Sequence, residues 1–243
     1  MSKQIIAIIS AFIRSVSDFK SGAFKYLFYS GMIALGLFIV LFYSIYQFSD
    51  AAGDWLASQI PWSWAQESFV FSFIVGLAVL YLFWILMKYI MLMLMSPLLT
   101  IVSEKAEEQL TGKIGGAGFS FGNSAVRSVR INMRNMLKEL VFTILLLIAG
   151  LIPGLNVFAL ITMFLVQAYF AGFGIMDFYL ERHLTLSQAV RQVYAHKWAA
   201  ITLGGIFTIL LLIPVFGVIV APYFTTITAT RYFGLMEKNI ASV

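Results

Sequence analysis

Cysteine is absent from this 243-residue sequence, and histidine occurs only at His183 and His196. Without cysteine there is no disulfide framework, no thiolate nucleophile and no cysteine metal site. Two histidines cannot supply a histidine-rich metal centre and argue against haem, so we expect neither a metal nor a cofactor. Charge is also scarce, at 11% of the residues against roughly 25% in an average soluble domain. The chain therefore has too little polar surface to cover a globule in water.

Hydrophobic residues make up 61% of the chain, which places most of it in lipid. The net charge of +5 could suggest nucleic acid as a partner. In a membrane protein, however, lysine and arginine gather on the cytoplasmic side. We therefore take the charge as a sign of topology and expect membrane lipids, not nucleic acid, around this protein.

Uncharged runs define the predicted architecture, an all-α integral membrane protein. Residues 26–49 and 68–87 lack charge, and each is long enough to cross a ~30 Å hydrocarbon core at ~1.5 Å per residue. The second membrane segment is expected to extend to about residue 95, past Lys88, and its helix to continue through MLMLMSPLLTIVSEKAEEQL, becoming charged near Glu104. That lysine either snorkels toward the headgroups, the favoured interpretation, or faces a protein interior.

Two later runs are interrupted by proline. Pro153-Gly154 divides the uncharged run 140–176, and Pro214 divides the run 198–230. Proline ends the helix before it, while Gly154, Asn156 and Gly217 would permit the tight turns that follow. The sequence therefore predicts two helical hairpins whose first arms are too short for a full crossing. The similar IPGLNV and IPVFGV breaks leave internal duplication open.

The N-terminal segment, residues 1–25, has helical spacing of apolar residues on one face, interrupted by charges. We expect it to lie in the membrane interface, with a packed amphipathic helix as the alternative. Every basic segment then falls on one side of the membrane, whereas the loop 50–67 carries only acidic residues among its charges. The basic side, including both termini, is predicted to be cytoplasmic.

The segment 96–138 is the most informative polar one. Glu104 and Glu107 precede a glycine-rich loop, and a second helix carries a row of basic residues on one face: Arg127, Arg130, Arg134 and Lys138. These residues could form an anion-attracting vestibule. They could equally bind lipid headgroups or pair with the glutamates.

Little else in the sequence predicts chemistry. Thr185 to Gln188 has the spacing of a helix capping box, and Asp177 could join a polar network or be solvated. The two histidines have no partner at ligand or triad spacing, and no paired carboxylates occupy a credible pocket. We therefore expect no catalytic residues and no enzyme.

The order of the segments along the chain resembles that of a known protein family. Two long apolar runs are followed by SPLLTIVSEKAEEQLTG, an arginine-bearing helix, LIPGLN and LLIPVFG. This pattern resembles the CysZ sulfate permease family, also known as the etoposide-induced-protein family. The resemblance covers most of the chain and implies one membrane domain over residues 1–243.

In that arrangement, residues 26–49 and 68–95 are the two long membrane helices. Residues 96–138 form cytoplasmic helices with the glycine-rich loop, and residues 177–197 form another cytoplasmic helix. Residues 139–176 and 198–230 form the two hairpins.

The resemblance also implies a function. It predicts a bacterial inner-membrane permease or channel that brings in sulfate, or a related oxyanion, for cysteine synthesis, working as a homo-oligomer. It places a sulfate contact in the turn SGAFKY, at Gly22 and Lys25, although Phe24 stands where relatives carry a second basic residue. Glu104, Glu107, Arg130 and Arg134 would form a cytoplasmic polar network. The alternative is a membrane scaffold on the same fold that transports nothing.

Overall fold

The computed structural model describes residues 1–17, 69–112, 121–150, 154–213 and 216–241, with residue 152 and short stretches between residues 27 and 47. These parts are helical and contain no strand. The helices are α1 (Ser2–Ser17), α4 (Phe69–Thr111), α5 (Phe121–Gly150), α6 (Asn156–His183), α7 (Leu186–Ala195), α8 (Lys197–Leu211) and α9 (Phe216–Ala241). The all-α class predicted from composition is confirmed.

Two helices of the described part are long and apolar enough to cross a membrane, at Phe83–Thr111 within α4 and at Asn156–His183. The first overlaps the expected membrane segment 68–95 and extends beyond it, because α4 runs unbroken through Pro97 to Thr111, as the expected continuation of this helix past Lys88 requires. Residues 26–49 are described only in short stretches. α6, expected to be one arm of a hairpin, is itself of spanning length.

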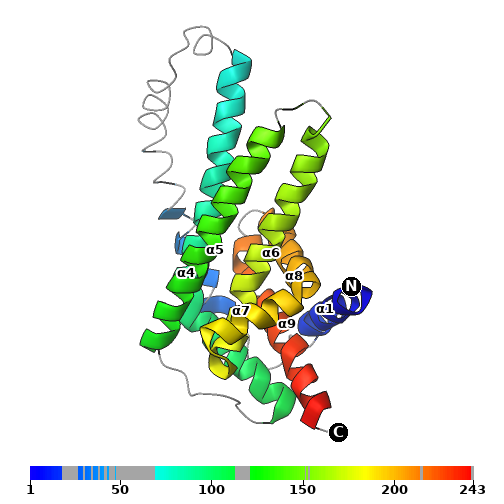
Figure 1. The fold of residues 1–243 in the computed structure, drawn as a ribbon. Coiled ribbons are helices and arrows are strands. Elements are labelled where there is room, and N and C mark those ends of the chain that lie inside the picture. The colour runs from blue at the N-terminus through cyan, green and yellow to red at the C-terminus, as the bar shows by residue number, and fades with distance from the viewer. Residues whose placement is uncertain are drawn as a thin grey trace.

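α5 and α6 form the first hairpin and stand side by side as an antiparallel pair (Figure 1). The break expected at Pro153-Gly154 is present, because α5 ends at Gly150 and α6 begins at Asn156. The first arm is longer than the uncharged run suggested. α5 has 30 residues, or ~45 Å, because the helix starts among the basic residues and continues into the apolar run.

The turn of this hairpin depends on Gly154, whose φ is +89°. Residues with a Cβ avoid this region, at a cost of about 1–2 kcal/mol. We therefore expect Gly154→Val to lower the stability of the protein by about that amount, with a fall in the midpoint of thermal unfolding in detergent. Gly122→Val is the control, because Gly122 is exposed, has no positive φ, and a Cβ added there would meet nothing within 4 Å. Equal melting temperatures for the two variants would contradict this role for Gly154.

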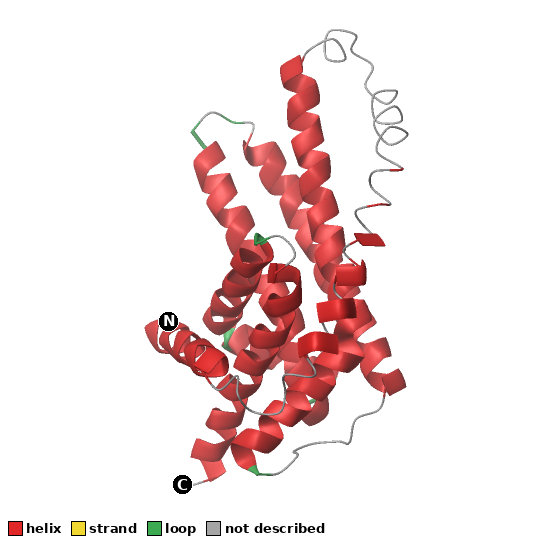
Figure 2. Cartoon of the chain, turned by 180° about the vertical axis from the view of Figure 1, so that it is seen from behind, coloured by secondary structure: helices red, strands yellow, loops and turns green. Residues whose placement is uncertain are grey.

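In the second hairpin, α8 ends at Leu211 and α9 begins at Phe216, and these two helix ends lie part-way along the α5–α6 pair (Figures 1 and 2). Here the expectation for Gly217 was wrong. Gly217 is not in the turn but in the first turn of α9, where its backbone N–H bonds the carbonyl of Ile213 at 2.8 Å. Glycine is needed there for space, since a Cβ would lie 1.8 Å from the Leu210 carbonyl oxygen.

α1 lies crosswise to the long helices, against the side of the bundle in the half farther from the α5–α6 turn (Figure 2). One apolar face of α1 packs against the bundle, and a second apolar face is exposed. Ile8 and Ala11 are buried, and α1 contacts α8 and α9. A second apolar row remains exposed at Ile6, Ile9, Ile13 and Val16. Packing of one face against the bundle, the alternative, is thus confirmed, and contact of the exposed face with the membrane interface stays a prediction.

Candidate functional site: a buried polar core

Polar side chains line the inner faces of α4 and α5. On α4 the buried row is Ser96, Thr100, Ser103 and Glu107; on α5 it is Ser124, Ser128, Asn132, Asn135, Glu139 and Thr143. Steps of three and four residues keep each row on one helix face. We call this set, with the α6 residues that contact it, the polar core. Buried polar residues in apolar helices are costly and point to a functional role.

Lys88 of α4 pairs with Glu139 of α5. The Lys88 ammonium lies 2.8 Å and 2.9 Å from the two carboxylate oxygens, and the Tyr89 hydroxyl donates to Oε2 at 2.6 Å. Both charged side chains are almost completely buried, at 1% and 0% exposure. The favoured expectation that Lys88 snorkels was therefore wrong, and its alternative, a lysine facing the protein interior, holds.

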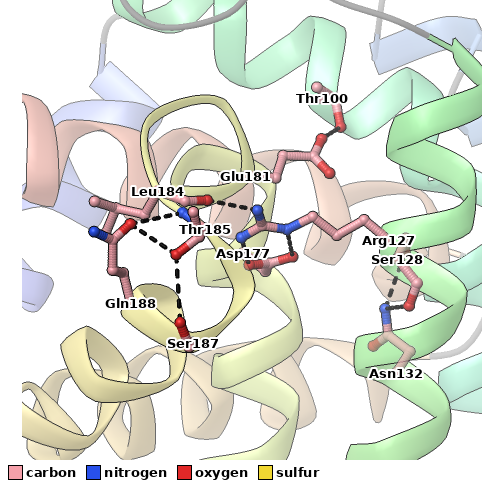
Figure 3. Close-up of polar contacts among 10 residues, drawn as sticks. All are labelled: Thr100, Arg127, Ser128, Asn132, Asp177, Glu181, Leu184, Thr185, Ser187 and Gln188. Atoms are coloured by element: carbon pink, nitrogen blue, oxygen red, sulfur yellow. Dashed lines mark hydrogen bonds and ion pairs between the residues drawn. The ribbon is translucent and has the colours of Figure 1, made fainter.

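Arg127 of α5 forms a bidentate ion pair with Asp177 of α6. Its Nη2 lies 2.8 Å from Oδ1 and its Nε 3.2 Å from Oδ2. Figure 3 shows the guanidinium plane facing the carboxylate, while Nη1 donates to the Leu184 carbonyl at 2.6 Å. Two parallel hydrogen bonds fix both distance and orientation. Asp177 therefore belongs to a polar network and is not solvated.

Arg182 of α6 pairs with Glu107 of α4, and its Nη2 donates to Ser103 at 2.9 Å. His183 approaches the same carboxylate, with its Nε2 3.1 Å from Oε1. Ser103 is also 2.8 Å from the Thr230 hydroxyl of α9, so this cluster joins three helices. Close by, Thr100 donates to Glu181, which joins α4 and α6 once more (Figure 3).

These three ion pairs connect α4 with α5, α5 with α6, and α6 with α4. Each pair of helices in this triangle therefore shares one hydrogen-bonded charge pair, and only Arg127 among the six residues is partly exposed. Burying two charges is costly unless their geometry is good, so the pairs specify how the three helices align. They also leave the polar core close to neutral.

Several buried amide groups of the polar core have no partner among the described residues. They are Asn132 Oδ1, both amide atoms of Asn135, and Gln167 Nε2. A Cβ on Gly174 would lie 2.6 Å from Asn132 Oδ1, so α6 makes room for this amide. An unsatisfied buried polar group costs about 1–3 kcal/mol. Such groups are suited to receive water or a polar solute.

The comparisons with known proteins agree with this architecture. The family model described as Sulfate transporter CysZ/Etoposide-induced protein 2.4 matches residues 11–222. This chain belongs to that family. No curated protein matches it. The resemblance identified from the segment order is thereby confirmed, and a transporter-like membrane role follows at the level of the family.

Four residues were expected to form one cytoplasmic network, and the structure does not join them by ion pairs. They are Glu104, Glu107, Arg130 and Arg134. Among the described residues, no ion pair joins Glu104 or Glu107 to Arg130 or Arg134; Glu107 instead binds Arg182 and His183. Arg130 is exposed. The Arg134 guanidinium lies 5.4 Å from the centre of the Phe173 ring, and its buried Nη1 has no hydrogen-bond partner in the described part.

Other predicted residues fall outside the described part of the chain. They are Gly22 and Lys25 of the expected sulfate contact, and Pro153 and Pro214 of the two turns. Asn156 is described and exposed, and its side-chain oxygen accepts a hydrogen bond from the Val157 backbone at 2.8 Å. The capping box at Thr185 is confirmed, because its backbone N–H donates to Gln188 Oε1 at 2.9 Å.

Sequence reasoning missed Arg182 and Glu139 as members of the site. A signal was present: Arg182 directly precedes a histidine at the end of an apolar run, and Glu139 directly precedes the next apolar run. Charges at the ends of apolar runs are usually assigned to the water boundary. Only the lengths of α5 and α6, which continue through these residues, show that they lie inside the bundle.

Proposed function

We propose that this protein is a CysZ-like permease or channel for sulfate or a related oxyanion, serving sulfate assimilation from the bacterial inner membrane. One observation carries the proposal beyond the family assignment. A polar core with unpartnered amide groups runs along the inner faces of helices that are otherwise apolar. A transported ion needs such groups to replace part of its hydration in a membrane.

The distribution of charge supports a cytoplasmic location for both termini. The C-terminal part of α9 lies at the end of the molecule opposite the α5–α6 turn, and α1, with the N-terminus, lies in the same half (Figure 1). The same end carries exposed basic residues of α7 and α8, Arg191 and Lys197. Because basic residues concentrate on the cytoplasmic side, we assign this end to the cytoplasm. Assembly into a homo-oligomer is part of the proposal, since a path for a divalent anion needs more polar lining than one neutral core supplies.

The proposal is tested by uptake of radiolabelled sulfate into proteoliposomes that contain the purified protein. We expect uptake above that of empty liposomes, and a severalfold reduction in Lys25→Ala, because this lysine is the basic residue retained in SGAFKY. Lys105→Ala is the matched control, since Lys105 forms an exposed pair with Glu108. Sulfate uptake that is equal in Lys25→Ala and wild type would remove Lys25 from the site.

One observation favours a second candidate, a membrane scaffold that transports nothing. Lys88, Arg127 and Arg182 are each paired with a carboxylate, so their charges serve to hold helices together. A scaffold would need these ion pairs for its stability and would need no path for an anion. Folded, inserted protein that gives no uptake of sulfate, phosphate or chloride would favour this function.

A further inference from the structure

The row of basic residues on α5 divides into two groups in the structure. Arg127 turns inward and pairs with Asp177. Arg130 and Lys138 are exposed and Arg134 is half-buried, and among the described residues no carboxylate forms an ion pair with any of these three. The single acidic residue of α5 is itself buried in a pair with α4. The outer face of α5 therefore keeps three positive charges that no described carboxylate neutralises.

The same face of α5 becomes apolar toward the α5–α6 turn. Val141, Leu145 and Ile148 are exposed, and steps of three and four residues from Lys138 keep them on the face of the basic row. From Lys138 to Ile148 the helix rises ~15 Å, which is half of a ~30 Å hydrocarbon core. Positive charge followed by apolar surface of one leaflet's depth matches the headgroup and the acyl chain of a phospholipid.

Arg134 differs from the other two bases because its guanidinium is held in place. It lies 5.4 Å from the centre of the Phe173 ring, and its buried Nη1 lacks a hydrogen-bond partner in the described part of the chain. Tyr169 packs edge-on against Phe173 and lies close to both Arg134 and Tyr194. Tyr194 is exposed, with the Lys197 ammonium 5.9 Å from the centre of its ring. Tyrosines gather at the membrane interface, and a guanidinium offers a planar set of donors that suits a phosphate group.

We propose that this face of α5 binds an anionic phospholipid of the cytoplasmic leaflet, with the lipid phosphate on Arg134 and the acyl chain along the apolar row. The inference goes beyond the proposed function and does not require transport. Charge complementarity selects the occupant, because three bases without an acid attract a headgroup with a net negative charge more than one without. Arg130 and Lys138 add to this attraction from the two sides of Arg134.

The test titrates the purified full chain in detergent with phosphatidylglycerol, or with phosphatidylcholine of the same acyl chains. Native mass spectrometry measures the fraction of protein that carries a lipid. We expect phosphatidylglycerol to bind more tightly than phosphatidylcholine. Arg134→Gln should weaken phosphatidylglycerol binding about fivefold, the effect of one basic residue near an anionic membrane surface. Arg134→Lys should recover only part of this loss, because an ammonium keeps the charge but lacks the planar set of donors.

Arg14→Gln is the matched control, because it removes the same charge from an exposed position on α1, whose contacts are with α8 and α9. It should bind phosphatidylglycerol like wild type. Equal binding of the two lipids by wild type, or an equal loss in Arg14→Gln and Arg134→Gln, would overturn the inference. Should Arg134→Gln fail to fold, Arg130→Gln/Lys138→Gln decides, because it changes exposed residues only; weaker phosphatidylglycerol binding is expected, and unchanged binding would contradict the site.

A free oxyanion at the same bases is distinguished from a lipid by thermal unfolding. Sodium sulfate and sodium phosphate are each added without lipid, against sodium chloride of equal ionic strength, and phosphatidylglycerol is added separately. We expect phosphatidylglycerol to raise the unfolding midpoint of wild type more than that of Arg134→Gln, and the two inorganic anions to affect both proteins equally. Stabilisation by sulfate or phosphate that is lost in Arg134→Gln would assign Arg134 to a free anion and overturn the lipid site.

Discussion

Replacing Gly204 with alanine is expected to disrupt the fold, whereas the same change at the next residue, Gly205, should be tolerated. α6 and α8 cross where Gly172 and Gly204 face each other. A Cβ on Gly204 would lie 1.8 Å from the Ala168 carbonyl oxygen, and one on Gly172 would lie 1.9 Å from the Ala200 carbonyl oxygen. Both obstacles are backbone atoms, which cannot rotate away.

This crossing has a sequence origin. Ala168 and Gly172 on α6, and Ala200 and Gly204 on α8, are small residues four positions apart. In lipid, helices associate through close packing, and such small residues let two backbones approach. Overpacking a tight site lowers the free energy of unfolding by about 1–3 kcal/mol. Because the added Cβ would clash with backbone atoms, we expect Gly204→Ala to lose stability at or above the upper end of this range.

Gly205 provides the control on the same helix. A Cβ there would meet only the end of the Phe164 ring, at 3.9 Å, an ordinary contact. Alanine is favoured over glycine in a helix by about 1 kcal/mol, so Gly205→Ala should match or exceed wild-type stability. The measurement is the midpoint of thermal unfolding, followed by the yield of monodisperse protein on size exclusion in detergent. Similar behaviour of the two alanine variants would show that this crossing does not limit stability.

Local rules predicted much of the fold, whereas the site depended on packing between distant segments. The break at Pro153-Gly154 and the capping box at Thr185 each follow from a few neighbouring residues, and both are found. Lys88 and Glu139 are 51 positions apart, and nothing local links them. Their meeting depends on how far α4 and α5 continue and on how these helices align.

Charge was also a poor guide to helix boundaries. The uncharged run before Pro153 starts at residue 140, but α5 starts at Phe121. Arg127 and Glu139 are tolerated inside this helix because each meets an opposite charge on a neighbour. A sequence pattern assigns charges to water by default, since the burial of a charge becomes acceptable only when its partner is known. The polar core therefore could not be found before the helices were assembled.

Removal of Arg182 is the second change with a large expected effect. Arg182 is 3% exposed in its side chain, as is its partner Glu107. Breaking a buried ion pair by removing one partner costs about 3–5 kcal/mol, because it leaves an uncompensated charge. We expect Arg182→Met to lose stability in this range, measured as the shift in thermal unfolding of the detergent-solubilised protein.

Two further variants test whether the loss of stability comes from the unpaired buried charge. Lys105→Met breaks the exposed pair with Glu108, where the side chains are 41% and 45% exposed. Because solvent screens such a pair, its loss should cost about 0–1 kcal/mol. Arg182→Met/Glu107→Gln removes both buried charges and should recover part of the loss, since the remaining amide can still bond to His183.

The cycle formed by the two single variants and the double variant then isolates the coupling between Arg182 and Glu107. A positive coupling would show that Arg182 acts through the charge of Glu107 and thereby holds α6 against α4. If the double variant is instead as unstable as the sum of the single ones, Arg182 stabilises the bundle through its packing and its bond to Ser103. The triangle of buried pairs would then be a consequence of how the helices pack and not the cause of their alignment.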